Sequence, residues 1–283
     1  MTDIYENLRV GFIGAGSIAE AMITGLTRGK VIQPRNIAVV NRSNHVRLQE
    51  LEDRYQLSRH SHDEQAILES DVIVLAIKPK FAGQVLQDWG PKFRKNQLIL
   101  SVIAGVSTDQ IEAACPQKVA VVRTMPNTSA AVGRSATAIC SGRHVKEHDI
   151  STAKTILEAI GIVIEVQEPQ MDAVTGLAGS GPAYFYYMVE AMQKAGVYVG
   201  LEADIARQLL IQTCIGAAEM LLHTGKEPSR LREEVTSEGG TTFAGLTTLK
   251  KFHFEEAICE AIFKATERSQ ELGKPASDLS SRC

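Results

Sequence analysis

The sequence lacks both a basic surplus and any long hydrophobic run. Its 283 residues carry 30 Lys and Arg against 33 Asp and Glu, which gives a formal net charge of −3. Without an excess of positive charge the chain is poorly suited to hold a polyphosphate backbone, so we expect no nucleic-acid partner. The longest uninterrupted apolar runs, such as residues 72–77, are far shorter than the roughly 20 residues that span a bilayer, so we expect no membrane association.

Cysteine pairs and a secretory leader are also missing. The five cysteines are scattered and form no CxxC pair, which argues against a disulfide framework and against a metal site of the zinc type. The first residues, MTDIYE, contain neither a basic region nor an apolar segment of the secretory kind. With 44% hydrophobic and 22% charged residues the composition is that of a globular protein, and we expect it to be cytoplasmic with reduced thiols.

Short β-rich runs alternate with helical stretches over the first half of the chain. Runs such as residues 71–77 are apolar without alternation, which is typical of parallel strands covered on both faces. This order predicts an α/β fold with an open parallel sheet and helices on both of its faces. The expected strands are residues 8–13, 36–40, 71–77, 98–103, 118–123, 136–140 and 162–166, and the expected helices are 17–27, 46–55, 108–114 and 152–160.

Strand signals stop near residue 167, where the sequence becomes helical throughout. The composition therefore divides the chain into two predicted domains, residues 1–166 and residues 167–283. Long helices are expected at residues 182–196, 203–224 and 254–272, with shorter ones near Met171, Ser229 and Thr242.

The expected helix 203–224 is apolar around almost its whole circumference. Its polar residues, among them Asp204, Gln208 and Gln212, form one narrow stripe at helical spacing. Such a helix has to be buried on nearly all sides. Either the rest of the helical domain or a second subunit would cover it, and we favour an obligate oligomer.

A glycine loop lies between the first expected strand and the first expected helix. In its G-x-G-x-x-A sequence Gly14 permits a tight turn, Gly16 lets the backbone approach a pyrophosphate, and Ala19 keeps the helix close to the sheet. Glycines also close ordinary strand–helix turns, but the position after the first strand of a βαβ unit favours dinucleotide binding at the helix N-terminus. We assign six residues to this site: Gly14, Ala15, Gly16, Ser17, Ile18 and Ala19.

The residues after the second expected strand indicate which dinucleotide binds. NAD-specific folds usually place a carboxylate there to hold the ribose hydroxyls. This chain instead has Asn41, Arg42 and Ser43, without an acid. An arginine fork and a hydroxyl bind a 2′-phosphate, which a carboxylate would repel. An exposed arginine is also common on any surface, but beside the glycine loop it favours NADPH, with NADH as the alternative cofactor.

Two further strand ends supply candidate cofactor residues, because ligands of open α/β sheets bind at the carboxyl ends of the strands. Ala76, Ile77, Lys78 and Pro79 lie at the carboxyl end of the third expected strand and are assigned to the adenosine or nicotinamide-ribose side, although Pro79 also simply ends the strand. Ala104 and Gly105 follow the fourth strand, where the lack of side-chain bulk allows a flat nicotinamide ring to approach.

Two segments of the helical half are unusual. Residues 179–184, GSGPAY, place Pro182 at the first position of a helix after small residues. Residues 235–242, VTSEGGTT, place two glycines and several hydroxyls before another helix, which leaves free backbone amides suitable for a small carboxylate. Glycine-rich loops without a ligand are commoner in general, so from the residues alone both interpretations stay open.

Together these segments resemble the pyrroline-5-carboxylate reductase family over essentially the whole chain. The resemblance is carried by the glycine loop, by residues 122–128 (VRTMPNT), by residues 173–184 (AVTGLAGSGPAY) and by residues 235–242; residues 41–43 also resemble the NADP-binding segment of bacterial members. It implies an N-terminal Rossmann-type domain, an all-α C-terminal dimerisation domain, and reduction of pyrroline-5-carboxylate to L-proline, the last step of proline biosynthesis. It further implies a homodimer with interlocked helical domains, which often assembles further into a decamer.

The resemblance also implies which residues hold the substrate. Gly240, Thr241 and Thr242 would bind the carboxylate and the ring nitrogen, with Thr242 as the catalytic hydrogen-bond donor. One departure is Glu238, which stands where the family commonly has proline. The change removes a fixed φ angle and brings a carboxylate close to an anion site, which affects substrate affinity more than reaction type. The full set of implied substrate residues is Val235, Ser237, Gly239, Gly240, Thr241 and Thr242.

The expected reaction needs little side-chain chemistry, because a cyclic imine protonates readily and then accepts hydride once the two carbons are aligned. The quoted segments contain no clear Lys, His or Asp dyad, which fits an imine better than an alcohol that needs a base. A β-hydroxyacid dehydrogenase is the nearest rival, but it would need an early lysine, and the first one after residue 184 is Lys194. A non-catalytic NADP-binding regulator is the second rival, favoured only by Glu238.

Overall fold

The computed structural model describes residue 5, residues 7–57 and residues 63–273. The chain divides into two compact units, each described below by itself. Unit 1 consists of Met1–Ser180 with Phe263–Cys283, and unit 2 of Gly181–Ile262.

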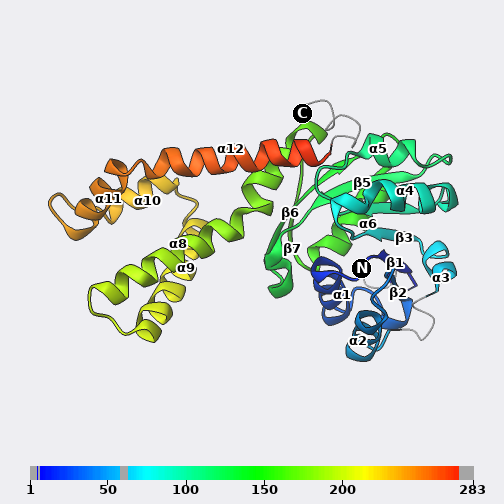
Figure 1. Ribbon diagram of the computed structural model, residues 1–283, viewed down its shortest axis with the longest axis horizontal. Coiled ribbons are helices and arrows are strands. Elements are labelled where there is room, and N and C mark those ends of the chain that lie inside the picture. Colours follow the sequence, from blue (N-terminus) through cyan, green and yellow to red (C-terminus); the bar gives the residue numbers. More distant parts are fainter. Residues whose placement is uncertain (1–4, 6, 58–62, 274–283) are drawn as a thin grey trace. The chain divides into compact units, whose positions relative to one another are not determined.

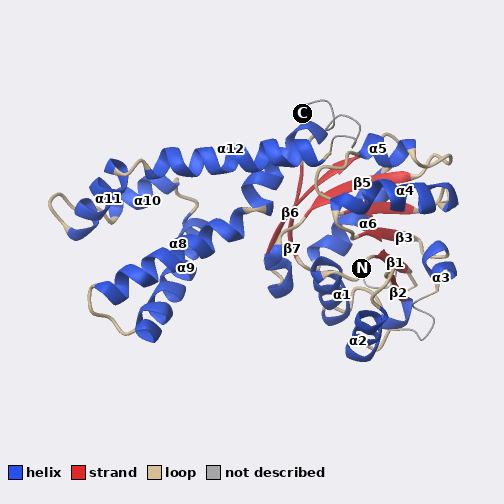
Figure 2. Ribbon diagram, in the orientation of Figure 1, coloured by secondary structure: helices blue, strands red, loops and turns tan. Residues whose placement is uncertain are grey.

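Unit 1 is built on a seven-stranded sheet with the order β2-β1-β3-β4-β5-β6-β7 (Figures 1 and 2). The expected α/β sheet is confirmed, with one difference: β6 runs antiparallel to β5, and the other pairs are parallel. The reason is the connection of residues 126–134, which is shorter than the dozen or so residues that a parallel crossover needs. The strands are β1 (Val10–Ile13), β2 (Ile37–Val40), β3 (Val72–Leu75), β4 (Leu98–Ser101), β5 (Ala120–Met125), β6 (Ser135–Ser141) and β7 (Gly161–Glu165).

Helices cover both faces of this sheet, and successive residues of one strand enter two different cores. Val72 and Val74 of β3 pack with α1 (Ser17–Arg28), α2 (His45–Tyr55) and α6 (Glu147–Glu158). Ile73 and Leu75 pack on the opposite face. There the covering helices are α3 (Glu64–Leu68), α4 (Ala82–Trp89) and α5 (Thr108–Ala113). The apolar, non-alternating runs in the sequence therefore reflect burial on both faces.

A buried guanidinium joins the sheet to the segment that follows it. Arg123 of β5 is 3% exposed in its side chain, donates from Nη1 to Glu168 Oε1 at 2.6 Å, and from Nη2 to Asp172 Oδ1 at 3.2 Å. Glu168 Oε2 also accepts from Thr108 Oγ1 at 2.8 Å and from Cys140 Sγ at 3.2 Å. Burial, reinforced by the charge of Glu168, raises the pKa of the Cys140 thiol to about 12, so this cysteine is an inert hydrogen-bond donor.

Unit 2 is entirely helical. It contains α8 (Gly181–Tyr198), α9 (Ala203–Thr224), α10 (Pro228–Glu234), α11 (Thr241–Lys251) and the first half of α12 (Phe254–Leu272). α8 packs against α9, and Gly200, at a φ of +103°, makes the turn between them. Of residues 181–262, all of which the structure describes, only Gly181 and Ala206 are buried in the single chain.

The apolar circumference of α9 is therefore exposed in the single chain. Leu222 is 73% exposed, and Leu209, Ile211 and Ile215 are each about half exposed. By length and hydropathy α9 would also suffice to cross a membrane, although the sequence contains no such uninterrupted run. The same properties suit a helix that is covered by a second subunit.

We expect Glu168→Gln to lower the free energy of unfolding at pH 7 by about 1–3 kcal/mol, because a neutral amide replaces the charged partner of Arg123. Burial tends to raise the pKa of Glu168, but hydrogen bonds from Arg123, Thr108 and Cys140 hold it below its usual 4.5. A carboxyl with a lowered folded pKa stabilises the protein above its unfolded pKa and loses that effect as the pH falls through the folded value. The difference between the two proteins in urea denaturation should therefore shrink below about pH 4.5.

The matched control is Glu165→Gln, which removes an exposed carboxylate of β7 whose partner is Lys154. Its effect should stay within about 1 kcal/mol at every pH. A penalty for Glu168→Gln that does not change with pH would contradict the assignment.

Candidate functional site

The carboxyl ends of β1, β2 and β3 meet at one point of the sheet edge in unit 1. Gly14 N, just after β1, donates to Val40 O at the end of β2 at 2.8 Å, and Ala76 N, just after β3, donates to Ile13 O at 2.9 Å. Since β2 and β3 lie on opposite sides of β1, the strand order reverses here. In open α/β sheets such a switch point is the place where ligands bind.

The two glycines of the loop play different parts at this edge. Gly14 has a φ of +110°, and a Cβ there would lie 2.2 Å from Ala76 O, so only glycine permits this approach of β1 to β3. Gly16 is the N-cap of α1 without a side-chain cap, and a Cβ there would meet nothing within 4 Å. The open space beside Gly16 lies at the unpaired first amides of α1, which include those of Ser17, Ile18 and Ala19. Such a cradle fits a pyrophosphate.

The acidic side chain of Glu20, in the first turn of α1, is neutralised by two arginines. Glu20 forms ion pairs with Arg47 and Arg54 and accepts from Tyr55 Oη. Burial tends to raise the pKa of Glu20, but these partners hold it below its usual value. Arg47 Nε also donates to Ala15 O at 3.3 Å and so ties α2 to the glycine loop. Arg47 cannot be recognised from the sequence, because nothing in the charged run of α2 distinguishes it.

The turn after β2 fits a 2′-phosphate. Asn41, Arg42 and Ser43 follow the carboxyl end of β2, with Arg42 and Ser43 exposed. Among the residues that the structure describes, no carboxylate forms a salt bridge with Arg42, so its guanidinium is available. Asn44, the next residue, caps α2 by accepting from Arg47 N at 2.9 Å. The cap fixes the turn without using the side chain of Arg42.

The remaining predicted cofactor residues lie at the same edge of unit 1. Ile77, half-buried beside Ala76, would be 3.1 Å from a Cβ on Gly14, so the segment before Lys78 and Pro79 borders the glycine loop directly. Ala104 and Gly105 follow β4, and Ala104 packs against a small core that includes Met125. Gly105, at a φ of +77°, also faces the end of α12: a Cβ there would be 2.8 Å from Gly273 N. The close packing against α12 therefore explains the glycine at position 105 independently of any ligand.

The predicted substrate residues belong to unit 2 and surround the start of α11. Gly239 has a φ of +72°, Gly240 N donates to Ser237 O at 3.0 Å, and Gly240 is the N-cap of α11 without a side-chain cap. The first amides of this 11-residue helix, beginning with those of Thr241 and Thr242, have no partner within the helix. Val235, Ser237 and Glu238 are exposed in the loop that leads to it. The loop and the helix start thus form a second anion cradle.

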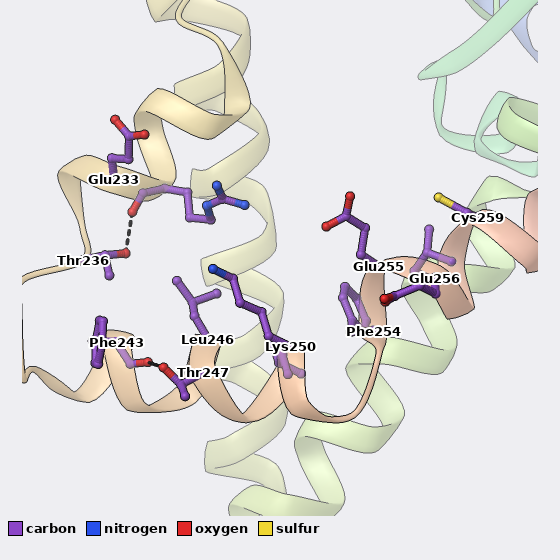
Figure 3. A pocket seen from close by; sticks show the side chains of 13 residues that line it. Glu233, Thr236, Phe243, Leu246, Thr247, Lys250, Phe254, Glu255, Glu256 and Cys259 are labelled. Carbon is purple, nitrogen blue, oxygen red and sulfur yellow. Dashed lines mark hydrogen bonds between the residues drawn. The ribbon is translucent and has the colours of Figure 1, made fainter.

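A hollow of about 740 Å³ lies next to this loop within unit 2 (Figure 3). Its apolar lining comes from α11 and α12 and includes Phe243, Leu246 and Phe254, while Lys250 extends from α11 into the opening. The neighbouring Thr236 lines it, but none of the six predicted substrate residues does. The cradle and the hollow are therefore adjacent but separate features. Across residue 5 and residues 7–57 and 63–273, no group of three His, Cys, Asp or Glu side chains is arranged to hold a metal ion.

Proteins of known family match this chain over nearly its whole length. A family model described as pyrroline-5-carboxylate reductase dimerisation matches residues 168–272. A second one, described as NADP oxidoreductase, coenzyme F420-dependent, matches residues 9–105. Among curated relatives, pyrroline-5-carboxylate reductase 1 of Bacillus subtilis is 46% identical over 274 residues, which cover 97% of this chain and 92% of the relative. The pyrroline-5-carboxylate reductase of Synechocystis is 40% identical over 268 residues, covering 95% of this chain and 99% of the relative.

Solved structures are similar over the same length. A pyrroline carboxylate reductase of Plasmodium falciparum with NADP bound matches with a TM-score of 0.86 and 30% identity, covering 95% of this chain and 99% of that one. A pyrroline-5-carboxylate reductase of Coxiella burnetii matches with a TM-score of 0.86 and 33% identity, covering 95% and 100%.

We expect Arg42→Ala to weaken NADPH binding at least tenfold while changing NADH binding less than twofold, because only NADPH carries the 2′-phosphate that the guanidinium would hold. Dissociation constants measured by the fluorescence of each reduced cofactor test this. Arg35→Ala, which removes an exposed arginine at the amino end of β2, is the control and should leave both constants unchanged. Equal weakening of both cofactors by Arg42→Ala would show that this residue does not select the phosphate.

Proposed function

This chain belongs to the pyrroline-5-carboxylate reductase family, and we propose that it reduces the cyclic imine pyrroline-5-carboxylate to L-proline with NADPH, the last step of proline biosynthesis. The observation that carries the proposal is the presence of two separate helix-start cradles, one in each unit. The cradle at Gly16 with Arg42 suits a dinucleotide that bears a 2′-phosphate. The cradle at Gly240 suits a small carboxylate. Sequence identity of 40–47% over nearly the whole chain supports this pairing of sites.

The substrate carboxylate is bound by the free amides at the start of α11. Ser237 O already accepts from Gly240 N, which closes the turn and points the amides of Thr241 and Thr242 outward from the helix start. The exposed hydroxyl of Thr242 donates to the ring nitrogen of the neutral imine and accepts from its N–H once the nitrogen is protonated, and Val235, Ser237 and Gly239 shape the loop. Glu238 is exposed, and we expect its charge to be screened by the solvent.

The chain's task in the reaction is to align the reactants. NADPH, when bound, supplies the hydride that is added to the carbon of the C=N bond. The residues assigned to its site are Gly14 to Ala19, Asn41 to Ser43, Ala76 to Pro79, and Ala104 with Gly105. Since a cyclic imine is basic enough to be protonated near neutral pH, Thr242 has only to orient the nitrogen, and no strong base is required.

The exposed apolar face of unit 2 supports a proposal for the assembly. We propose that a second copy of the chain covers α9 and the apolar hollow beside α11, since the face of α9 is too apolar to remain in water. In this proposal residues 1–166 bind the cofactor, residues 167–283 bind substrate and dimerise, and dimers assemble further into a decamer. The protein is cytoplasmic and works without a membrane.

The activity itself is tested by adding pyrroline-5-carboxylate to purified protein and following NADPH oxidation. We expect Thr242→Ala to lower kcat about 10- to 100-fold and to leave the NADPH dissociation constant unchanged, because one hydrogen bond to the reacting group is lost. Thr248→Ala, whose hydroxyl donates to Ala244 O in the same helix, is the control. No turnover by the wild-type protein would leave the regulator as the better proposal, and full activity of Thr242→Ala would remove this hydroxyl from the mechanism.

The oligomer is tested by light scattering during gel filtration. We expect the mass of a dimer or a multiple of it at low micromolar concentration, and Leu222→Glu should reduce it towards the 30.8 kDa of one chain, because the charge enters the apolar contact. Lys194→Glu, an exposed change on α8, serves as the control for charge alone. A wild-type protein that elutes as a single chain would contradict the assembly.

A further inference from the structure

Two segments carry the chain between its units, and in unit 1 both are bound to the same carboxylate. The first segment contains α7 (Met171–Val174) and the π-helix Thr175–Gly179, and it leads out of unit 1 at Ser180. The second is α12, which re-enters unit 1 at Phe263. Asp172 Oδ1, in α7, accepts from Arg123 Nη2 at 3.2 Å and from Ser269 Oγ of α12 at 2.7 Å.

We call Arg123, Asp172 and Ser269 the Asp172 clamp. Ser269 is 2% exposed, although serine in a long surface helix is normally solvated. The buried guanidinium of Arg123 fixes the position of Asp172, since an unpaired charge in this place is strongly unfavourable. The hydroxyl of Ser269 then holds α12 to that same fixed oxygen.

The end of α12 also lies against the loop assigned to the nicotinamide. A Cβ on Gly105 would be 2.8 Å from both Ser269 O and Gly273 N, so the backbones of loop and helix are in direct contact. Gln110 Nε2 donates to Gly273 O at 2.8 Å and secures the last turn of the helix. Ser269 thus contacts Asp172 through its hydroxyl and borders the cofactor loop through its carbonyl.

From these contacts we propose that Arg123, Asp172 and Ser269 are positioning residues for hydride transfer. They restrict the movement of both connections on which the substrate residues are carried, and they support the loop at Gly105 from the side of α12. The inference rests on the proposed function, which places the hydride donor in unit 1 and the acceptor in unit 2. Hydride transfer is sensitive to such restriction, because a misplacement of about 1 Å costs on the order of 100-fold in rate.

The test is Ser269→Ala, which removes one hydroxyl and leaves both cradles intact. We expect kcat to fall about tenfold, while KM for pyrroline-5-carboxylate and the NADPH dissociation constant change less than twofold, because binding uses other residues. The deuterium isotope effect with NADPH labelled at the transferred position should rise, since the hydride step becomes slower than product release. Without substrate, amide exchange of residues 175–180 should become faster, because α7 has lost a partner.

The control is Thr152→Ala, which removes a hydroxyl of α6 that donates to His148 O of its own helix and should leave all five measurements unchanged. A kcat of Ser269→Ala within twofold of wild type, or a loss of kcat matched by an equal loss of NADPH affinity, would overturn the inference. An unchanged isotope effect would overturn it as well. Failure of the proposed function is seen separately, as no turnover by the wild-type protein, and the exchange measurement still reports on the clamp in that case.

Discussion

The structure of unit 1 depends on one almost fully buried positive charge. Arg123 lies in β5, between β4 and β6, and two carboxylates that come 45 and 49 residues later in the chain compensate it. Each carboxylate then binds a further element, Glu168 through Thr108 and Cys140, and Asp172 through Ser269. A charge in this position cannot remain unpaired, so it requires the segment after β7 and the end of α12 to pack at one place. The apolar cores of the sheet stabilise the fold, but this charge determines where the helical connections attach.

The local pattern of apolar residues is sufficient to predict most of the fold. The bounds expected for α9 and α12, residues 203–224 and 254–272, agree with those found, because long helices have a periodicity that loops interrupt clearly. α6 instead begins at Glu147, five residues before the expected start at 152, because the carboxylate of Asp149, which accepts from Lys146 N at 2.8 Å, rather than an apolar residue marks its first turn. The direction of β6 was missed for a different reason. Strand direction depends on the length of a connection, and a pattern of apolar residues does not contain it.

Some residues of the candidate site could likewise be predicted from the sequence, and others could not. The glycine loop and the start of α11 are visible in the sequence because a tight turn, a close backbone approach and a free helix start each restrict the residue types at consecutive positions. Arg47 and Ser269 act through partners far away in the chain: Arg47 binds Ala15 O across 32 residues, and Ser269 binds Asp172 across 97. Their neighbours in sequence look like ordinary charged helix surface. Such residues are recognised only in the folded structure, because the neighbouring sequence does not distinguish a solvated side chain from one that is hydrogen-bonded to a distant part of the chain.

The near-neutral composition and the two cradles have a common physical basis. A protein that binds nucleic acid needs many cations, since each phosphate is a full charge exposed to water. In the proposed function the anions are small and each would meet the start of a helix, where several amides and the helix dipole act together over a few ångströms. One arginine then suffices for selectivity, and the remaining charges can serve ion pairs such as those of Glu20 and Arg123. Because backbone amides neither titrate nor change rotamer, they hold the anionic ends of both reactants in fixed places, and this suits a reaction whose rate depends chiefly on alignment.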